Sequence, residues 1–322
     1  METKDRLLIM GHKLGDIDSF GASVGIYRIA TALNKKAHIV INDVTSSVRP
    51  MMERFVNNPD YPEDLFLNGE QAAELVDANT ILVVVDVNRP SITDAPALLK
   101  MVKTIVGLDH HHQSSEIIEN AVLSYVEPYA SSACEMVAEV LQYIADGIKM
   151  KSQEADAMYA GIVIDTNNFT NQAGVRTFEA AAYLRRSGAD ITRVRKLFRD
   201  DMAEYKVKAK AVDKAEVIEG AFAISERQGE GIENPTIIAA QTANELLGIK
   251  GIKASVVLTE YQGVIYLSAR SIDEVNVQII MERMGGGGHM NTAACQMEGV
   301  GLVEAIGVLK NTIDDMLESG EI

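Results

Sequence analysis

The sequence predicts an α/β protein of two domains, the first built on a parallel sheet and the second smaller. A chain of 322 residues is long enough for two ordinary domains that each have their own core. Short apolar runs alternate with helix-like segments over residues 7–188, which is typical of strands and helices around a parallel sheet. A highly charged stretch at 192–219 then separates this part from one with a hairpin pattern.

The composition indicates a soluble, cytoplasmic protein. Apolar residues make up 47% of the chain and charged residues 24%, as in ordinary globular domains. No apolar run approaches the roughly 20 residues of a membrane span, and the start is too polar for a signal peptide, so no membrane contact is expected. The net charge of -16 argues against a surface that grips long nucleic acid. Cys134 and Cys295 are predicted to be reduced and buried, within helical segments.

Expected strands and helices alternate in the first domain. Strands are predicted at 7–10, 38–41, 81–85 and 104–108, and helices at 19–33, 70–76, 132–145 and 176–187. Ser132 and Glu135 have capping-box spacing, which marks the start of the third helix. The apolar segment 157–164, which ends at Asp165, fits either a strand or a helix.

The second domain follows the stretch 192–219, which contains no glycine or proline and is predicted as one connecting helix. Strands are then predicted at 221–225, 254–259 and 264–269, a mixture of strand and helix at 236–247, and a last helix at 303–318. We therefore expect domains at 1–191 and 220–322, joined by a helical linker at 192–219.

Potential metal ligands follow successive apolar segments. They are His12, Asp16, Asp18, Asp86, His110 and Asp165. If each apolar segment is a strand of one parallel sheet, these side chains meet at the carboxyl edge, where open α/β sheets bind ligands. A mixture of imidazole and carboxylate suits Mn, Fe, Co or Zn. Two ions about 4 Å apart would activate water and neutralise a phosphate, with Asp86 as the shared carboxylate.

Each ligand taken alone has a simpler explanation. Asp16 and Asp18 could cap a helix, His12 could lie in a surface loop, and Asp86 could begin a turn. The run Asp109-His110-His111-His112 is harder to explain by structure alone, since the chain has six histidines in total.

A glycine run at 285–288 precedes His289 in the second domain. Backbone N–H groups of such a run can approach a phosphate closely, and the imidazole of His289 can donate to it. Arg270, which follows a predicted strand, could reach the same phosphate. The simpler explanations are a flexible loop and a solvated arginine.

Together these motifs resemble the DHH/DHHA1 phosphoesterase superfamily. Asp109-His110-His111 is similar to its namesake motif, and Gly286-Gly287-Gly288-His289 to the signature of its second domain. Five stretches most resemble the catalytic module of GdpP-type cyclic-di-AMP phosphodiesterases: MGHKLGDIDSFGASVGIYRIA, VINDVTSSVRPMM, VDVNRP, YVEPYASSACEMV and SARS. The resemblance implies hydrolysis of cyclic di-AMP to linear 5′-pApA, two Mn²⁺ ions (or else Fe²⁺ or Co²⁺), and a homodimer.

The resemblance also assigns a role to each candidate residue. His12 and Asp16 would hold the first metal, Asp18, His110 and Asp165 the second, and Asp86 would bridge both. The implied catalytic residues are Asp86 and His111, which would position the scissile phosphate, while Asp109 orients the histidines. Substrate contacts are implied for Ser132, Arg270, Gly287, Gly288 and His289.

The chain departs from the family in two respects. His112-Gln113 stands where the family usually has Arg-Arg, which removes two positive charges beside the expected site. Full-length members also carry membrane helices, a PAS-type sensor and a degenerate GGDEF-type domain before this module. We therefore expect either an excised catalytic part of a membrane-anchored protein or a protein that lacks the regulatory part.

Three other functions would use related sites. A nanoRNase or 3′-phosphoadenosine phosphate phosphatase would use the same metals on linear substrates. An inorganic pyrophosphatase would share the first domain, but the glycine motif of the second argues against it. A nucleotide sensor without turnover is disfavoured because every expected ligand is present.

Overall fold

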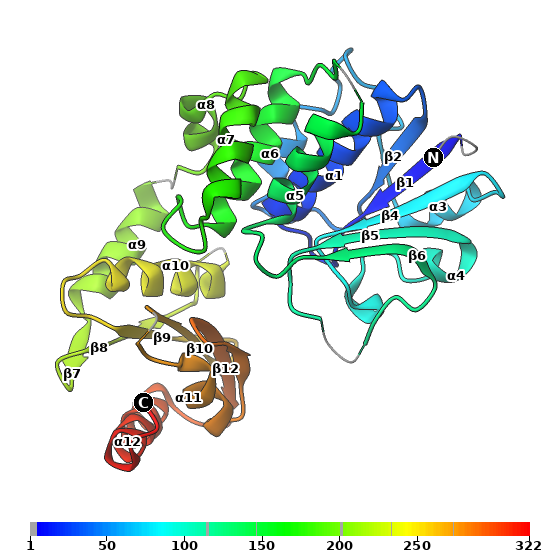
Figure 1. Cartoon of the computed structure of the whole chain (residues 1–322). Coiled ribbons are helices and arrows are strands. Elements are labelled where there is room, and N and C mark those ends of the chain that lie inside the picture. The colour runs from blue at the N-terminus through cyan, green and yellow to red at the C-terminus, as the bar shows by residue number, and fades with distance from the viewer. Residues whose placement is uncertain (1–4, 114–115, 146, 200–201, 233, 273) are drawn as a thin grey trace. The chain divides into compact units, whose positions relative to one another are not determined.

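A computed structural model of the chain describes residues 5–113, 116–145, 147–199, 202–232, 234–272 and 274–322. The chain divides into two compact units, Met1–Arg199 and Asp200–Ile322 (Figure 1). No helix of these described stretches is both long enough and apolar enough to cross a membrane.

A six-stranded parallel sheet forms the centre of the first unit, which confirms the predicted architecture. Its strands are β1 (Arg6–Met10), β2 (Lys36–Val40), β3 (Phe66–Leu67), β4 (Thr80–Val85), β5 (Thr104–Asp109) and β6 (Ala121–Val126). They lie in the order β3-β2-β1-β4-β5-β6. The chain order reverses between β1 and β4, where Met10 pairs with Val84, so the segments that follow these strands emerge side by side.

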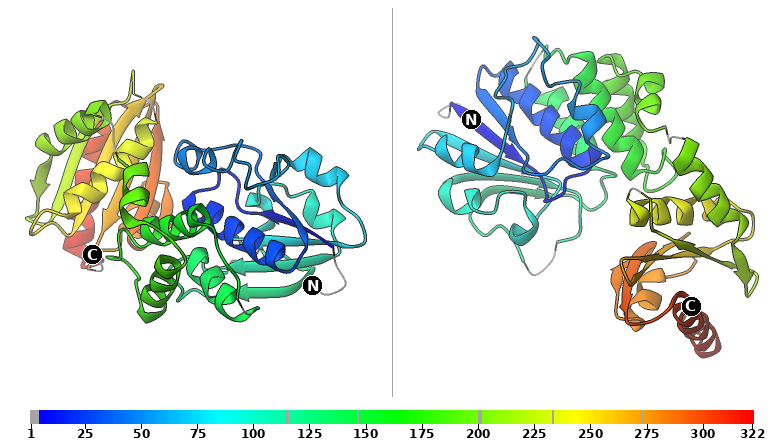
Figure 2. Two further views of the ribbon diagram at one scale, coloured as in Figure 1. Left: turned by 90° about the horizontal axis from the view of Figure 1, so that it is seen from above. Right: turned by 180° about the vertical axis from the view of Figure 1, so that it is seen from behind.

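Helices cover both faces of this sheet (Figure 2). The helices on one face are α1 (Ile17–Ala32), α2 (Arg49–Met52), α5 (Ala133–Tyr143), α6 (Ser152–Asp165), α7 (Val175–Arg186) and α8 (Ile191–Leu197), and those on the other are α3 (Gly69–Glu74) and α4 (Leu98–Met101). Because strand side chains alternate, Leu7 and Ile9 pack into the first core, and Leu8 and Met10 into the second. The strands are therefore buried on both faces and read as continuous apolar runs.

The second unit contains a mixed six-stranded sheet. Its strands are β7 (Glu216–Ile218), β8 (Phe222–Gln228), β9 (Ala254–Tyr261), β10 (Val264–Ser271), β11 (Gly287–His289) and β12 (Thr292–Glu298), in the order β11-β12-β10-β9-β8-β7. The β8–β9 pair is parallel, and the predicted hairpin of β9 and β10 is confirmed as an antiparallel pair. Helices α9 (Met202–Asp213) and α10 (Pro235–Leu247) pack on one face, and α11 (Val277–Arg283) and α12 (Leu302–Ser319) on the other.

The structure corrects several predicted elements. Cys295 lies in strand β12, not in a helix, although both cysteines are free and buried as expected. The stretch 192–219 is not one helix: it contains most of α8, the whole of α9 and strand β7. Residues 236–247 are helical throughout, within α10. The ambiguous segment 157–164 is also helical, within α6.

Candidate metal centre

Three loops at the carboxyl edge of the parallel sheet carry most of the predicted ligands. His12 follows β1, Asp86 follows β4 directly, and His110 follows β5 directly. The prediction that Asp165 also ends a strand is wrong, because Asp165 is the last residue of helix α6. It still reaches the site, since α6 packs closely on α1: a Cβ at Gly21 would lie 2.6 Å from the carbonyl oxygen of Ala157. Three strand ends, the start of α1 and the end of α6 therefore supply the ligands.

The first group of ligand atoms surrounds His12. Its Nε2 lies 3.7 Å from Oδ1 of Asp16 and 3.5 Å from Oδ2 of Asp86. Asp16 is also the N-cap of α1, because its Oδ1 accepts a hydrogen bond of 3.0 Å from the N–H of Ser19. The helix-capping role of Asp16 thus exists together with its approach to His12. These three residues could hold one metal ion.

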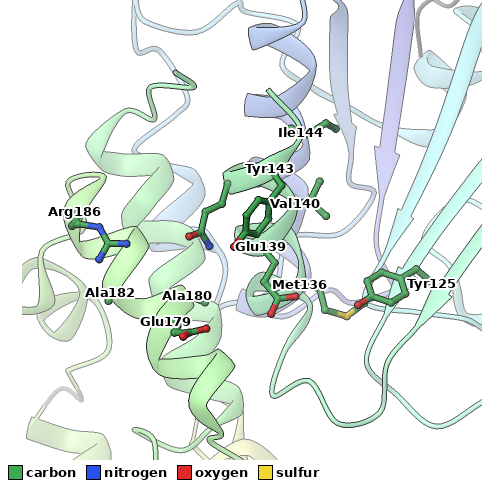
Figure 3. A pocket seen from close by; sticks show the side chains of 11 residues that line it. Tyr125, Met136, Glu139, Val140, Tyr143, Ile144, Glu179, Ala180, Ala182 and Arg186 are labelled. Carbon is green, nitrogen blue, oxygen red and sulfur yellow. The ribbon is translucent and has the colours of Figure 1, made fainter. Parts of the chain in front are cut away.

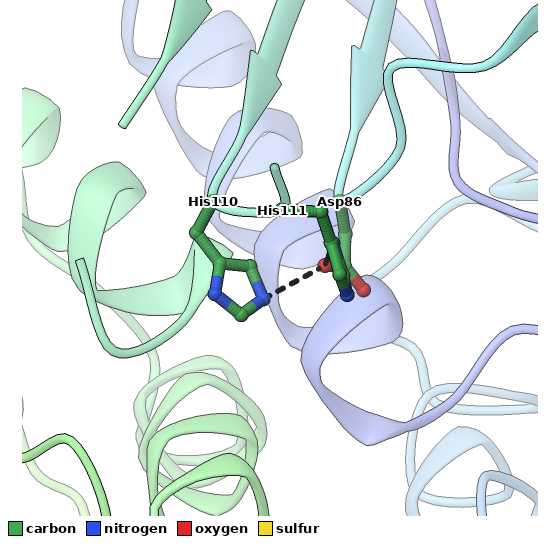
Figure 4. Close-up of side chains that lie close together, drawn as sticks. All are labelled: Asp86, His110 and His111. Atoms are coloured by element: carbon green, nitrogen blue, oxygen red, sulfur yellow. Dashed lines mark ion pairs between the residues drawn. The ribbon is translucent and has the colours of Figure 1, made fainter. Parts of the chain in front are cut away.

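The second group surrounds His110. Its Nε2 lies 3.3 Å from Oδ2 of Asp165, 3.9 Å from Oδ2 of Asp18 and 3.3 Å from Oδ1 of Asp86. Figure 4 shows the last of these pairs, in which Asp86 and His110 point toward one another from the ends of β4 and β5. Asp18, His110 and Asp165 form a second set that could hold a metal ion.

Asp86 lies between the two groups, and its surroundings fit a shared metal ligand. It is 2% exposed, and its backbone has a φ of 60°, a left-handed conformation that is uncommon outside glycine. Oδ1 of Asp86 and Nε2 of His110 are both buried, and neither makes a hydrogen bond within the described part of the chain. Buried polar atoms are normally satisfied, so these two atoms indicate a missing partner such as a cation.

The buried carboxylates and imidazoles of this cluster have pKa values that differ from their ordinary ones. Burial and the neighbouring Asp165 and Asp86 raise the pKa of Asp18 well above its ordinary range. Burial also raises the pKa of Asp165 to about 6, although His110 opposes the shift. Burial disfavours charged His110, but the carboxylates around it prevail and raise its pKa to about 11. Divalent cations would replace the protons on this set of carboxylates and imidazoles.

The first turn of helix α5 donates two hydrogen bonds to the carboxylate of Asp18. Oδ2 of Asp18 accepts a 2.6 Å hydrogen bond from the N–H of Ala133, and Oδ1 accepts a 3.0 Å bond from the N–H of Cys134. These amides belong to the first turn of α5, where backbone N–H groups and the helix dipole favour a negative charge. The sequence predicted the start of α5 from its capping residues but did not predict this use of its amides.

Ser132 has a structural role at the same helix. It is fully buried, and its hydroxyl accepts a 3.0 Å hydrogen bond from the N–H of Glu135 as the N-cap of α5. Of the capping box predicted from Ser132 and Glu135, the structure thus contains the hydrogen bond that the serine hydroxyl accepts. The hydroxyl of Ser132 therefore caps α5, and the substrate contact expected of this residue stays a prediction.

His111 lies at the open side of the centre. Its Nδ1 is 2.9 Å from Oδ1 of Asp109, which also accepts a 3.2 Å hydrogen bond from the backbone N–H of His111. The same Nδ1 lies 3.5 Å from Oδ1 of Asp86, and 52% of the side chain is exposed. The imidazole is therefore oriented by a buried carboxylate while half of the side chain is exposed, which suits contact with a bound substrate. His112 and Gln113 are exposed beside it.

The glycine run of the second unit is a packed strand, not a flexible loop. Residues 287–289 form β11, paired with β12. A Cβ at Gly286 would lie 2.1 Å from the carbonyl oxygen of Ala294, and a Cβ at Gly288 would lie 2.4 Å from that of Thr292. Gly287, in contrast, has open space where its Cβ would be. Gly286 and Gly288 are therefore required by packing, whereas Gly287 has room for a side chain.

Two of the predicted phosphate-binding residues of the second unit, Arg270 and His289, share one row of its sheet. Thr292 of β12 pairs with Arg270 of β10 on one side and with His289 of β11 on the other. Residues that pair directly across antiparallel strands project from the same face of a sheet. Within the described residues, the Arg270 guanidinium forms no ion pair and donates only to the carbonyl of Ala269, at 2.8 Å. Its charge is thus available to an anion, although burial lowers its pKa.

A groove on the first unit lies away from these ligands. It has a volume of about 730 Å³ and is lined by β6, α5 and α7, with Tyr125, Met136, Tyr143, Glu179 and Arg186 among its residues (Figure 3). None of its lining residues is a predicted site residue. A much smaller hollow of about 20 Å³ borders His12 and Asp16. The unsatisfied buried groups, and not the groove volume, therefore mark the candidate centre.

A parallel sheet with a carboxylate–histidine centre at its edge, followed by a mixed-sheet unit, defines a class of two-domain α/β proteins with a candidate two-metal site. The chain belongs to the DHH family: the N-terminal domain of that family matches residues 6–162, and the DHHA1 domain matches residues 220–319. Both domains implied by the sequence motifs are thus confirmed.

Comparisons with individual proteins agree with this assignment. The chain is 40% identical over 321 residues to the cyclic-di-AMP phosphodiesterase GdpP of Geobacillus thermodenitrificans, covering 98% of this chain and 48% of that protein. It therefore spans about half the length of this relative.

Two solved structures share the fold. An exopolyphosphatase-related protein from Bacteroides fragilis superposes with a TM-score of 0.84 at 20% identity, over 98% of this chain and 93% of the other. The RecJ protein of Thermus thermophilus in complex with Mn²⁺ has a TM-score of 0.54 at 13% identity, over 98% of this chain and 52% of the other.

Proposed function

We propose that this chain is a metal-dependent phosphodiesterase that hydrolyses cyclic di-AMP to linear 5′-pApA. The single observation that carries the proposal is the carboxylate–histidine centre around Asp86, in a chain 40% identical to a protein named a cyclic-di-AMP phosphodiesterase. The reaction consumes one water: a new P–O bond forms, one P–O3′ bond breaks, and a 3′-hydroxyl leaves with a proton.

The chain would hold two metal ions through six side chains. His12 and Asp16 would hold the first, Asp18, His110 and Asp165 would hold the second, and Asp86 would serve both. Two such ions supply an activated water near neutral pH and neutralise phosphate oxygens. Mn²⁺ is the proposed ion, because mixed imidazole and carboxylate ligands suit it and the RecJ structure of the same fold is a Mn²⁺ complex.

The remaining residues position the substrate. A ring N–H of His111, which Asp109 orients, would donate a hydrogen bond to an oxygen of the scissile phosphate. In the second unit, the Arg270 guanidinium binds a phosphate as a charge-assisted donor, together with His289 and the open backbone of Gly287.

The deciding experiment compares cyclic and linear substrates. With Mn²⁺ and cyclic di-AMP, the purified chain is expected to accumulate pApA, followed by chromatography, while pApA supplied directly is consumed more slowly. Rapid conversion of pApA to AMP with little attack on cyclic di-AMP would instead identify a nanoRNase. Rapid release of phosphate from 3′-phosphoadenosine phosphate would identify a phosphatase of that nucleotide, and rapid release from pyrophosphate would identify an inorganic pyrophosphatase.

We also propose that two copies associate through strand β6. This strand is an edge of the parallel sheet, and Val122, Leu123 and Tyr125 are 65%, 56% and 37% exposed. Edge strands are usually protected by charges or proline, but residues 121–126 contain neither. Antiparallel pairing of two β6 strands about a two-fold axis would form a self-complementary interface, and residues 121–126 bring no charge into it.

Sedimentation velocity over a range of concentrations tests the association. The unaltered chain is expected to sediment as a dimer and Val122→Lys as a monomer. Val303→Lys, at an 83% exposed position of α12, is the control and should remain dimeric. A monomeric wild-type chain, or a dimeric Val122→Lys variant, would rule out β6 as the interface.

A further inference from the structure

Residues 86–94, which follow β4, contact both neighbouring loops of the candidate metal centre. Toward the loop after β1, the N–H of Lys13 donates to the carbonyl of Ile92 at 2.7 Å, next to an antiparallel bridge between His12 and Thr93. Toward the loop after β5, the side-chain amide of Asn88 donates to the carbonyl of His111 at 3.2 Å. The segment thus connects the loop of His12 with the loop of His111.

Asn88 is not an ordinary loop residue. It is 8% exposed, and its Oδ1 is buried with no hydrogen-bond partner in the described stretches of the chain. A buried amide that uses only its donor side is costly, because its acceptor has lost water without replacement. Such a residue persists where its one hydrogen bond has a specific use.

Asn88 and Asp109 bind different atoms of His111. Asp109 binds the ring Nδ1 and the backbone N–H of His111, and it belongs to β5 itself. Asn88 binds the carbonyl of His111 from the loop after β4, two residues beyond Asp86. A second segment, the loop after β4, therefore also fixes His111 relative to Asp86.

We propose that Asn88 is a positioning residue that fixes His111 relative to Asp86. Its catalytic consequence rests on the proposed function, in which His111 contacts the scissile phosphate. Loss of the amide donor would leave in place the six side chains that the proposed function assigns to the metal ions and change where the imidazole of His111 lies, which itself faces Asp86 and His110. Supporting hydrogen bonds of this kind typically change activity by about 10- to 100-fold.

The test uses Asn88→Leu, which has a similar size but no donor, and Asn88→Ala as a second variant. Ser91→Ala is the matched control, because Ser91 lies in the same segment but its hydroxyl donates to Glu116 at 2.7 Å instead of to His111. Two measurements are made on the full chain: kcat and KM with cyclic di-AMP and Mn²⁺, and imidazole NMR signals with Mg²⁺, which is diamagnetic. The signals of His111 are assigned as those missing from His111→Gln.

Both Asn88 variants are expected to lower kcat by about 10- to 100-fold with KM and Mn²⁺ content within about twofold of wild type. They should also shift the His111 signals, whereas Ser91→Ala should change neither. Unchanged His111 signals, or a kcat within about twofold of wild type, would overturn the proposal. If the wild-type chain does not hydrolyse cyclic di-AMP, the proposed function fails, and the NMR signals alone still decide the role of Asn88.

Discussion

Nε2 of His110 lies 3.3 Å from Oδ1 of Asp86, although the two residues follow different strands of the parallel sheet. The other oxygen of Asp86 lies 3.5 Å from Nε2 of His12. One buried carboxylate thus faces one histidine of each ligand group, and its two oxygens are divided between them. This division makes Asp86 the residue on which the occupancy of both metal positions should depend.

Asp86→Asn is therefore expected to lose both metals together. The amide keeps the shape of the side chain but removes the charge that two cations would share. We expect Mn²⁺ content, measured by elemental analysis after dialysis, to fall toward zero and kcat to fall by about 100-fold or more. Asp77→Asn makes the same charge change at an exposed position of the same unit and should retain both. A fully loaded, active Asp86→Asn variant would contradict the bridging assignment.

Binding of Mn²⁺ should release protons. The pKa values of His12 and His110 are both raised to about 11 in the metal-free protein, where burial is outweighed by nearby carboxylates. Both imidazoles are thus protonated at pH 7, while metal ligation requires them neutral. Affinity should therefore increase with pH below about 11, by about tenfold per pH unit for each released proton. Calorimetry in buffers of different ionisation enthalpy counts these protons, and a count near zero would refute the expectation.

Substitutions in the glycine run should distinguish a glycine that packing requires from one that contacts the substrate. Gly286→Ala would place a Cβ 2.1 Å from the carbonyl oxygen of Ala294, so β12 must shift, and we expect a loss of about 1–3 kcal/mol in the free energy of unfolding. Gly287→Ala meets no atom within 4 Å and should leave thermal stability almost unchanged. If the backbone of Gly287 binds phosphate, its variant should still raise KM. Equal stability of both variants in calorimetry would contradict the packing of β11 on β12.

Arg270→Ala should weaken substrate binding more than it slows the reaction. Its guanidinium has no ion-pair partner within the described residues, so removing it breaks no internal salt bridge. Loss of one charge-assisted hydrogen bond to phosphate corresponds to about 1.5–3 kcal/mol, or about a 10- to 150-fold increase in KM. Arg283→Ala, which removes an exposed arginine paired with Glu321, is the control and should leave KM unchanged. A large fall in kcat with normal KM would place Arg270 at the reaction itself.

Much of the first domain could be predicted because its signals are local. Strands buried on both faces are continuous apolar runs, and that property alone predicts the strands at 81–85 and 104–108. Asp86 and His110 then follow by position, since both come directly after such a strand. Asp165 was also predicted to lie near them, but on the assumption that it follows a strand. It reaches the centre from the end of a helix, and an apolar run that ends in a carboxylate does not distinguish the two.

The contacts that hold the ligands could not be predicted from spacing. Asn88 and His111 are 23 residues apart, and Asp18 and Ala133 are 115 residues apart, so their pairing depends on the tertiary structure. The second unit was also harder to predict because β12 contains no run of large apolar residues. Short strands such as β7 and β11 depend on their neighbours in the sheet, which local sequence does not encode.

The two main-chain N–H groups that donate hydrogen bonds to Asp18 affect which ion the second metal position would prefer. A carboxylate held at both oxygens, with Gly161 closing the space beside it, cannot swing to follow a smaller or larger cation. Asp165 is 19% exposed and its carboxylate accepts no main-chain hydrogen bond within the described residues, so its side chain could adjust more readily to the radius of an ion. We therefore expect the second metal position to rank divalent ions by size, and the ranking to relax when the first turn of α5 is loosened.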